Sequence, residues 1–149
     1  MKKIRLKQND NSTSVNSAPD NKHKIIVIDD DAGIRDILTI IFERAGFIVD
    51  AKSDGKDILN NNFAHPDVFL IDRQLPGFDG LDICRYLKGQ LATKDIPVIM
   101  VSAWPDIGAA SKHAGADDYI EKPFEMDHLL KVVEQYIAKP GNRNKPSLQ

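Results

Sequence analysis

The 149-residue sequence has one cysteine, no long hydrophobic run and almost no net charge. The single Cys84 excludes a disulfide within the chain, and its helical spacing with Leu81 and Leu87 predicts a buried apolar role. No run approaches the roughly 18 apolar residues that a membrane span needs. The net charge of −2 gives neither sign an excess that would favour nucleic acid or a membrane surface as a direct partner.

The composition, 42% apolar and 28% charged, is typical of a globular domain. Residues 1–22 are polar and contain no apolar signal-peptide core, so we expect a disordered leader and a cytoplasmic protein. Residues 139–149 have the composition of a polar C-terminal tail. The folded unit is therefore expected at residues 23–138, which is enough for one domain.

Strand and helix patterns alternate within this unit. Apolar runs predict strands at 25–28, 47–51, 68–71, 96–101 and 119–120. Amphipathic segments predict helices at 34–45, 55–61, 81–91 and 126–138, and a short fourth helix that begins at Pro105 and ends before Gly115. The first helix is expected to bury one face, formed by Ile34, Ile37, Leu38, Ile41 and Ala45. The pattern predicts an α/β fold with a doubly wound, five-stranded parallel sheet.

Polar side chains follow four of the predicted strands. They are Asp29, Asp30 and Asp31 after the first strand, Asp72 after the third, Ser102 after the fourth, and Lys122 with Pro123 after the fifth. Asp31 is expected to begin the next helix, where the helix dipole favours an acid. Asp72 is either a solvated strand end or a carboxylate that the fold holds in place for chemistry. The carboxyl ends of parallel strands share one edge of the sheet, so these side chains should converge.

Three carboxylates at this edge would repel one another. At a separation of 4 Å and an effective dielectric constant of 20, each pair costs about 4 kcal/mol. A cation is therefore needed, and hard oxygen ligands suit Mg²⁺, which one or two carboxylates usually bind. Phosphoryl transfer onto an aspartate requires these groups together: Mg²⁺ beside the carboxylate, a lysine and a hydroxyl.

Four motifs in order resemble the receiver domain of two-component response regulators: "VIDDD", "PDVFLIDRQLPGFDG", "PVIMVSA" and "GADDYIEKPF". The resemblance covers residues 24–138. It implies a flavodoxin-like (βα)5 fold with strand order 2-1-3-4-5. It also implies a signalling switch that takes a phosphoryl group from a histidine kinase or a phosphotransfer protein, and that catalyses only its own phosphorylation and dephosphorylation.

The resemblance also implies roles for individual residues. Asp72 would be the phosphoacceptor, Asp30 a direct Mg²⁺ ligand, Asp29 a ligand mostly through water, and the backbone carbonyl of Gln74 the third protein ligand. Ser102 would move to the phosphoryl group, and Tyr119 would turn inward with it. Lys122 would pair with the acyl phosphate, with a cis bond between Lys122 and Pro123. Gln74 and Trp104 would flank the path of the attacking water and so set the lifetime of the phosphoryl group.

Three alternatives fit the residues less well. A haloacid-dehalogenase-type phosphatase needs a second acid where this chain has Gln74. A flavodoxin-like cofactor binder needs a phosphate-binding loop where this chain has three consecutive acids, Asp29–Asp31. A degenerate receiver that acts only as a scaffold should lack one of the acids or the lysine, and all are present.

The output of such a receiver depends on what surrounds it. A chain that ends after the short polar tail would act through a protein partner, including a homodimer through the fourth helix, fifth strand and fifth helix. A receiver fragment of a longer regulator would act through another domain. The residues leave both open.

Overall fold

The computed structural model describes residues 22–137. The expected tail, and the expected leader apart from Lys22, lie outside the described residues. No helix within residues 22–137 is long and apolar enough to cross a membrane.

A parallel sheet of five strands forms the centre of the fold. These are β1 (Lys24–Ile28), β2 (Ile48–Lys52), β3 (Val68–Asp72), β6 (Val98–Ser102) and β7 (Asp118–Glu121), arranged in the order β2-β1-β3-β6-β7. When these five strands alone are numbered in chain order, their order across the sheet is 2-1-3-4-5, as predicted. Every residue of β3 and β6 is buried, as the continuous apolar runs indicated.

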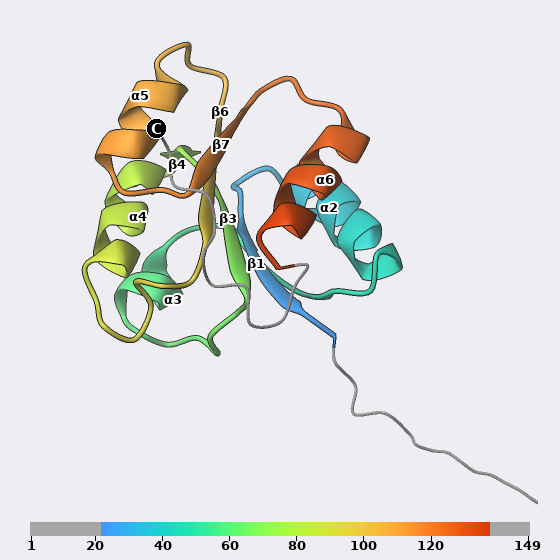
Figure 1. Cartoon of the computed structure of the whole chain (residues 1–149), viewed down its shortest axis with the longest axis horizontal. Helices are drawn as coiled ribbons and strands as arrows, with labels where there is room; N and C mark the ends of the chain where they lie inside the picture. Colours follow the sequence, from blue (N-terminus) through green and yellow to red (C-terminus); the bar gives the residue numbers. More distant parts are fainter. Residues whose placement is uncertain (1–21, 138–149) are drawn as a thin grey trace, which may run out of the picture.

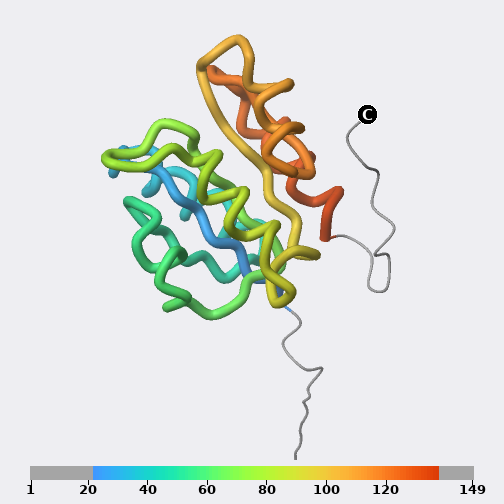
Figure 2. The backbone as a smooth tube through the Cα atoms, turned by 90° about the vertical axis from the view of Figure 1, so that its left-hand side faces the viewer, coloured from blue at the N-terminus to red at the C-terminus, as the bar shows by residue number. Residues whose placement is uncertain are grey.

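Helices cover both faces of this sheet (Figure 1). On one face lie α2 (Ala32–Arg44) and α6 (Met126–Gln135), and on the other α3 (Lys56–Leu59), α4 (Gly80–Lys88) and α5 (Ile107–His113). Figure 2 looks onto the second of these faces. Successive strand residues belong to opposite cores, with Ile25 and Val27 facing α2 and Ile26 and Ile28 facing α4, because side chains alternate along a strand.

The helices differ from the predictions in the buried face of α2 and in several bounds, since α3, α4 and α6 are shorter than predicted and α5 begins later. In α2 the buried residues are Leu38 and Phe42, whereas Ile37 is 45% exposed and Ala45 is also exposed. The α5 helix begins at Ile107, two residues after Pro105. Gly115 follows the end of α5 with a φ of +88°, as a terminating glycine should.

A small β-hairpin after β3 was not predicted. Its strands β4 (Gln74–Leu75) and β5 (Phe78–Asp79) are joined by Pro76 and Gly77, and Gly77 has a φ of +72°. The hairpin returns the chain to the end of β3, where the Gly80 N–H donates to the Arg73 carbonyl over 2.7 Å. A Cβ atom on Gly80 would collide with the Asp72 carbonyl, so this close return requires glycine.

Cys84 lies in the core, as predicted, on the fully buried side of α4. Burial raises the pKa of its thiol to about 12. We therefore expect no reaction of the folded protein with a thiol reagent such as DTNB at pH 8, and reaction of one thiol per chain after unfolding in guanidinium chloride. Rapid labelling of the native protein would show that the core around α4 opens easily.

Candidate functional site

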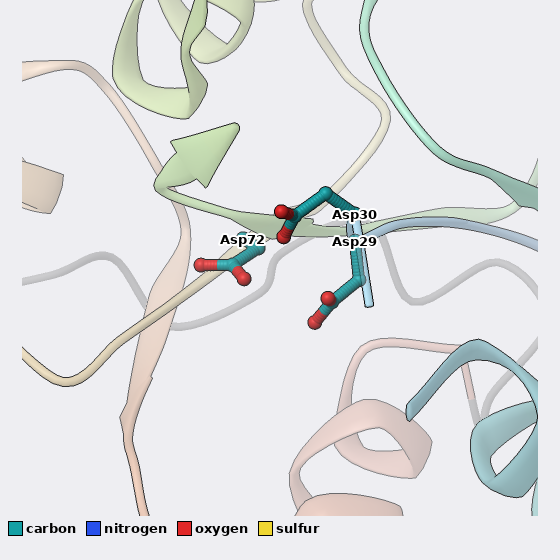
Figure 3. A group of neighbouring side chains, drawn as sticks. All are labelled: Asp29, Asp30 and Asp72. Carbon is teal, nitrogen blue, oxygen red and sulfur yellow. The ribbon is translucent and has the colours of Figure 1, made fainter. Parts of the chain in front are cut away.

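Three carboxylates meet at the carboxyl end of the sheet (Figure 3). Ligand oxygens of Asp29, Asp30 and Asp72 all lie within 4.8 Å of one another. This follows from the topology, because β1 and β3 are direct neighbours and the aspartates lie at or just beyond their ends. The convergence predicted from the strand ends is therefore present. Asp31 instead caps α2, and its carboxylate accepts from the Ile34 N–H over 3.1 Å.

The three acids have different surroundings. Asp29 and Asp72 are 4% and 5% exposed, whereas Asp30 is exposed. One oxygen of Asp29 accepts from the Asp31 N–H over 2.9 Å, and one oxygen of Asp72 accepts from the Gln74 N–H over 3.1 Å. The Asp30 carboxylate has no hydrogen-bond partner among residues 22–137. Its oxygens are therefore available to a ligand from solvent.

Lys122 brings a positive charge between the two buried acids. Its Nζ lies 2.9 Å from Asp72 Oδ2 and 3.4 Å from Asp29 Oδ2. The backbone places it there, since the Lys122 N–H donates to the Ser102 carbonyl over 2.8 Å across the ends of β6 and β7. The Lys122–Pro123 peptide bond is cis, as predicted.

The pKa values reflect this arrangement. Burial raises the pKa of the Asp29 carboxyl, and the charge of Asp72 adds to this, against the lowering effects of the Asp31 N–H and Lys122. Burial alone would lower the pKa of Lys122, but its hydrogen bond to Asp72 and the charges of Asp72 and Asp29 outweigh burial and raise it. Lys122 is therefore a firmly protonated cation between two acids, which leaves the cluster with excess negative charge.

Ser102 and Tyr119 lie on the neighbouring strands. Ser102 is fully buried at the end of β6, and its Oγ accepts from the Trp104 N–H over 3.0 Å. Tyr119 on β7 is 39% exposed. Its ring lies against α5 at Gly108, where an added Cβ would come within 3.1 Å of the Tyr119 ring carbon Cζ. The phenol thus lies outside the core in this structure.

A pocket of about 460 Å³ opens beside the acids. Its lining includes Asp30, Gln74 and Trp104, three of the residues singled out in the sequence. It also includes Arg73, which sequence reasoning missed. The Arg73 guanidinium lies 4.4 Å from the centre of the Trp104 ring and 3.0 Å from Asp106. The only sequence feature that could have pointed to Arg73 is its position directly after the strand-end Asp72.

A family model described as the response regulator receiver domain matches residues 25–134. The chain belongs to this family. Receiver domains are signalling switches of two-component systems, in which histidine kinases are their partners. The receiver described here has the family's flavodoxin-like fold, with the five-stranded sheet and helices on both faces.

Known proteins similar to this receiver include longer regulators. It is 35% identical over 121 residues to the DNA-binding response regulator MtrA of Mycobacterium tuberculosis, an alignment that covers 79% of this chain and 52% of MtrA. The receiver therefore spans about half the length of the curated MtrA relatives that it matches.

Two solved structures similar to this receiver contain beryllofluoride. One is the BeF3-activated receiver domain of DrrB, an OmpR/PhoB homologue of Thermotoga maritima, with 31% identity, a TM-score of 0.70, and coverage of 79% of this chain and 99% of that one. The other is TrrA of Thermotoga maritima in complex with Mg²⁺–BeF, with 26% identity, a TM-score of 0.69, and coverage of 77% and 99%.

Proposed function

We propose that Asp72 accepts a phosphoryl group from a histidine kinase or a phosphotransfer protein, with Mg²⁺ bound beside it, and that this switches a protein-binding surface. The observation that carries the proposal is the position of Lys122, which bridges Asp72 and Asp29 while Asp30 next to them has no partner in the described chain. One lysine cation does not balance three carboxylates, and a divalent metal ion would neutralise the remaining negative charge.

The donor set fits Mg²⁺. The carboxylates of Asp29, Asp30 and Asp72 are hard oxygen ligands, and Gln74, whose backbone carbonyl would be the third protein ligand, lines the same pocket as Asp30. Asp30 would bind the metal directly. Asp29, which accepts from the Asp31 N–H and from Lys122, would bind mostly through water, as the resemblance implies. The metal would neutralise charge on the transferring phosphoryl group.

The chain's own residues would perform the transfer. An oxygen of Asp72 forms the new bond to phosphorus, the bond from phosphorus to the donor nitrogen breaks, and that nitrogen keeps the electron pair. Lys122 then pairs with the phosphoryl oxygens, since its ammonium already contacts Asp72. Ser102 would turn its hydroxyl from the Trp104 N–H to the phosphoryl group, and Tyr119 would move inward from Gly108.

The metal site is tested by thermal unfolding. We expect several millimolar Mg²⁺ to raise the melting temperature by about 4 °C for each kcal/mol of binding, because the metal binds only the folded cluster. Asp30→Ala should remove most of this rise and Asp29→Ala less of it, with the exposed Asp95→Ala as a control. An Mg²⁺ effect that is equal in all four proteins would contradict the assigned ligands.

The lifetime of the phosphoryl group is proposed to depend on Trp104 and Gln74. Trp104 is bulky, and its indole has a donor but no acceptor that could hold and orient an attacking water by its protons, so we expect slow hydrolysis. Trp104→Asn should speed the loss of the phosphoryl group several-fold, because a carboxamide can hold such a water. Intact-mass spectra taken over time after removal of the donor would measure this. A decay rate that changes with neither Trp104 nor Gln74 would exclude the idea.

The surface that changes is proposed to comprise α5, β7 and α6, the fourth helix, fifth strand and fifth helix of the predictions. The α5 helix has only seven residues, and Tyr119 is partly exposed beside it. A downstream protein or a second copy of the chain would dock there. Because the chain spans about half the length of its MtrA relatives, output through a further domain is equally compatible with this proposal.

A further inference from the structure

Arg73 connects the end of β3 to the loop that follows β6. Its side chain is only 13% exposed, and its Nη1 donates to Asp106 Oδ1 over 3.0 Å. The same guanidinium lies 4.4 Å above the ring of Trp104. Both contacts reach residues of one short segment, the loop 103–106, which lies more than 30 positions further along the chain. A planar guanidinium suits this double contact, because it stacks and donates at once.

The rest of the guanidinium is less well satisfied. Nε lies 3.6 Å from Asp79 Oδ1, which is beyond hydrogen-bond distance, and it is buried with no acceptor in the part of the chain that the structure describes. The Asp79 carboxylate instead accepts from the Leu81 N–H at the start of α4. An unmade hydrogen bond at a buried donor is costly. Apart from this longer ion pair to Asp79, the guanidinium is therefore held by its contacts to the loop 103–106.

This loop also holds Ser102 in its present orientation. The Trp104 N–H donates to Ser102 Oγ, and Ser102 is fully buried. A Ser102 hydroxyl that turns toward Asp72 has to leave this N–H, so the hydrogen bond couples the orientation of Ser102 to the position of the loop. Any contact that fixes Trp104 or Asp106 therefore also stabilises the resting orientation of Ser102.

We propose that Arg73 is a positioning residue that fastens the loop 103–106 to β3 and so opposes activation. The proposal rests on the phosphorylation of Asp72 proposed above. Phosphorylation would have to overcome the ion pair to Asp106 and the stack on Trp104, so weakening either contact should make activation easier. A merely structural Arg73, which only covers the indole, would leave the activation equilibrium where it is.

The chain supplies its own reporter, because Trp104 is its only tryptophan. Beryllofluoride is titrated into the protein at fixed Mg²⁺ while the Trp104 fluorescence is recorded. The concentration at half of the change is compared, since the amplitude itself depends on the stack. The variants are Arg73→Gln, Asp106→Asn and the double variant. Arg85→Gln is the matched control, as it removes another Arg–Asp pair, to Asp82 within α4.

We expect Arg73→Gln and Asp106→Asn each to lower the half-saturating concentration by about two- to fivefold, as for the loss of one partly exposed ion pair or cation–π contact. The half-saturating concentration of the double variant should be little lower than that of Arg73→Gln alone, and that of Arg85→Gln should match the wild type. The two single variants remove opposite charges, so a simple electrostatic effect on metal or anion binding would shift them in opposite directions. Asp106 is well exposed, so its variant should fold normally.

The failures are distinguishable. No fluorescence or thermal response of the wild type to Mg²⁺ and beryllofluoride would overturn the proposed function and this inference with it. A wild-type response that is unchanged in Arg73→Gln and Asp106→Asn, or shifted in opposite directions, would overturn only the role of Arg73. As a second measurement, the amides of the loop 103–106 should exchange hydrogen faster in resting Arg73→Gln than in the wild type, and equal exchange would contradict the proposal.

Discussion

Asp72→Asn is expected to abolish phosphorylation of the protein by acetyl phosphate or a histidine kinase. The amide cannot act as the nucleophile, and Asp72 is the acid that contacts both Lys122 and the Gln74 N–H. The fold should survive, since the substitution removes one of three crowded negative charges as well as one ion pair. We expect the free energy of unfolding to change by no more than about 1 kcal/mol.

The measurement is the intact mass after incubation with Mg²⁺ and acetyl phosphate. Asp95→Asn makes a matched control, because this exposed acid precedes β6, at the opposite end of the sheet. The control should gain a phosphoryl group as the wild type does. A phosphoryl group on Asp72→Asn would mean that another residue is the acceptor, and the assignment of Asp72 would be wrong.

Lys122→Met is expected to lower both the stability of the metal-free protein and the rate of phosphorylation, and its effect should be second only to that of Asp72→Asn. Without the ammonium, Asp29 and Asp72 face each other with no cation, so the metal-free protein should lose about 2 kcal/mol of stability, less than for a fully buried pair. The phosphorylation rate should fall by about 10²–10³-fold, the usual effect of removing one charge-stabilising donor. The variant should still bind Mg²⁺, since the three carboxylates remain.

Urea unfolding with and without Mg²⁺ tests the first effect, and the rate of mass gain with acetyl phosphate tests the second. Lys131→Met removes an exposed lysine of α6 and should change neither. A Lys122→Met protein that is phosphorylated at the wild-type rate, or that shifts its NMR spectrum on activation as the wild type does, would exclude the proposed role of Lys122.

The sheet and its strand-end acids were predictable because the signals are local. The residues of β3 and β6 form continuous apolar runs, which only a strand covered on both faces buries completely. Once the strands are parallel, Asp29 and Asp72 have to lie at the same edge. The cluster of carboxylates then follows from topology alone.

The buried face of α2 was not predictable in the same way. Apolar side chains occupy so many of positions 34–42 that several faces of the helix fit the pattern. The structure selects Leu38 and Phe42, and the Phe42 ring meets Phe47 edge-to-face at 5.3 Å just before β2. Ile37 is left partly exposed because packing against the sheet, not periodicity, decides the rotation of the helix.

The hairpin β4–β5 and the contacts of Arg73 depend on tertiary proximity. "LPGFDG" indicates a turn, but the pairing of Gln74 with Asp79 depends on the return of the chain at Gly80 to the end of β3. Arg73 reaches Asp106 only because β3 and β6 are neighbours. No pattern within one segment could have shown that these two residues form an ion pair.

The most direct test of the account is to map the phosphoryl group on the wild-type chain. The protein is incubated with acetyl phosphate in the presence of Mg²⁺ or of EDTA, and the acyl phosphate is trapped by reduction with borohydride. Peptide mass spectrometry then locates the modified residue. We predict one modified aspartate, Asp72, in the sample with Mg²⁺ and almost none in the sample with EDTA. Modification at another residue, or equal modification of Asp72 without metal, would contradict the account.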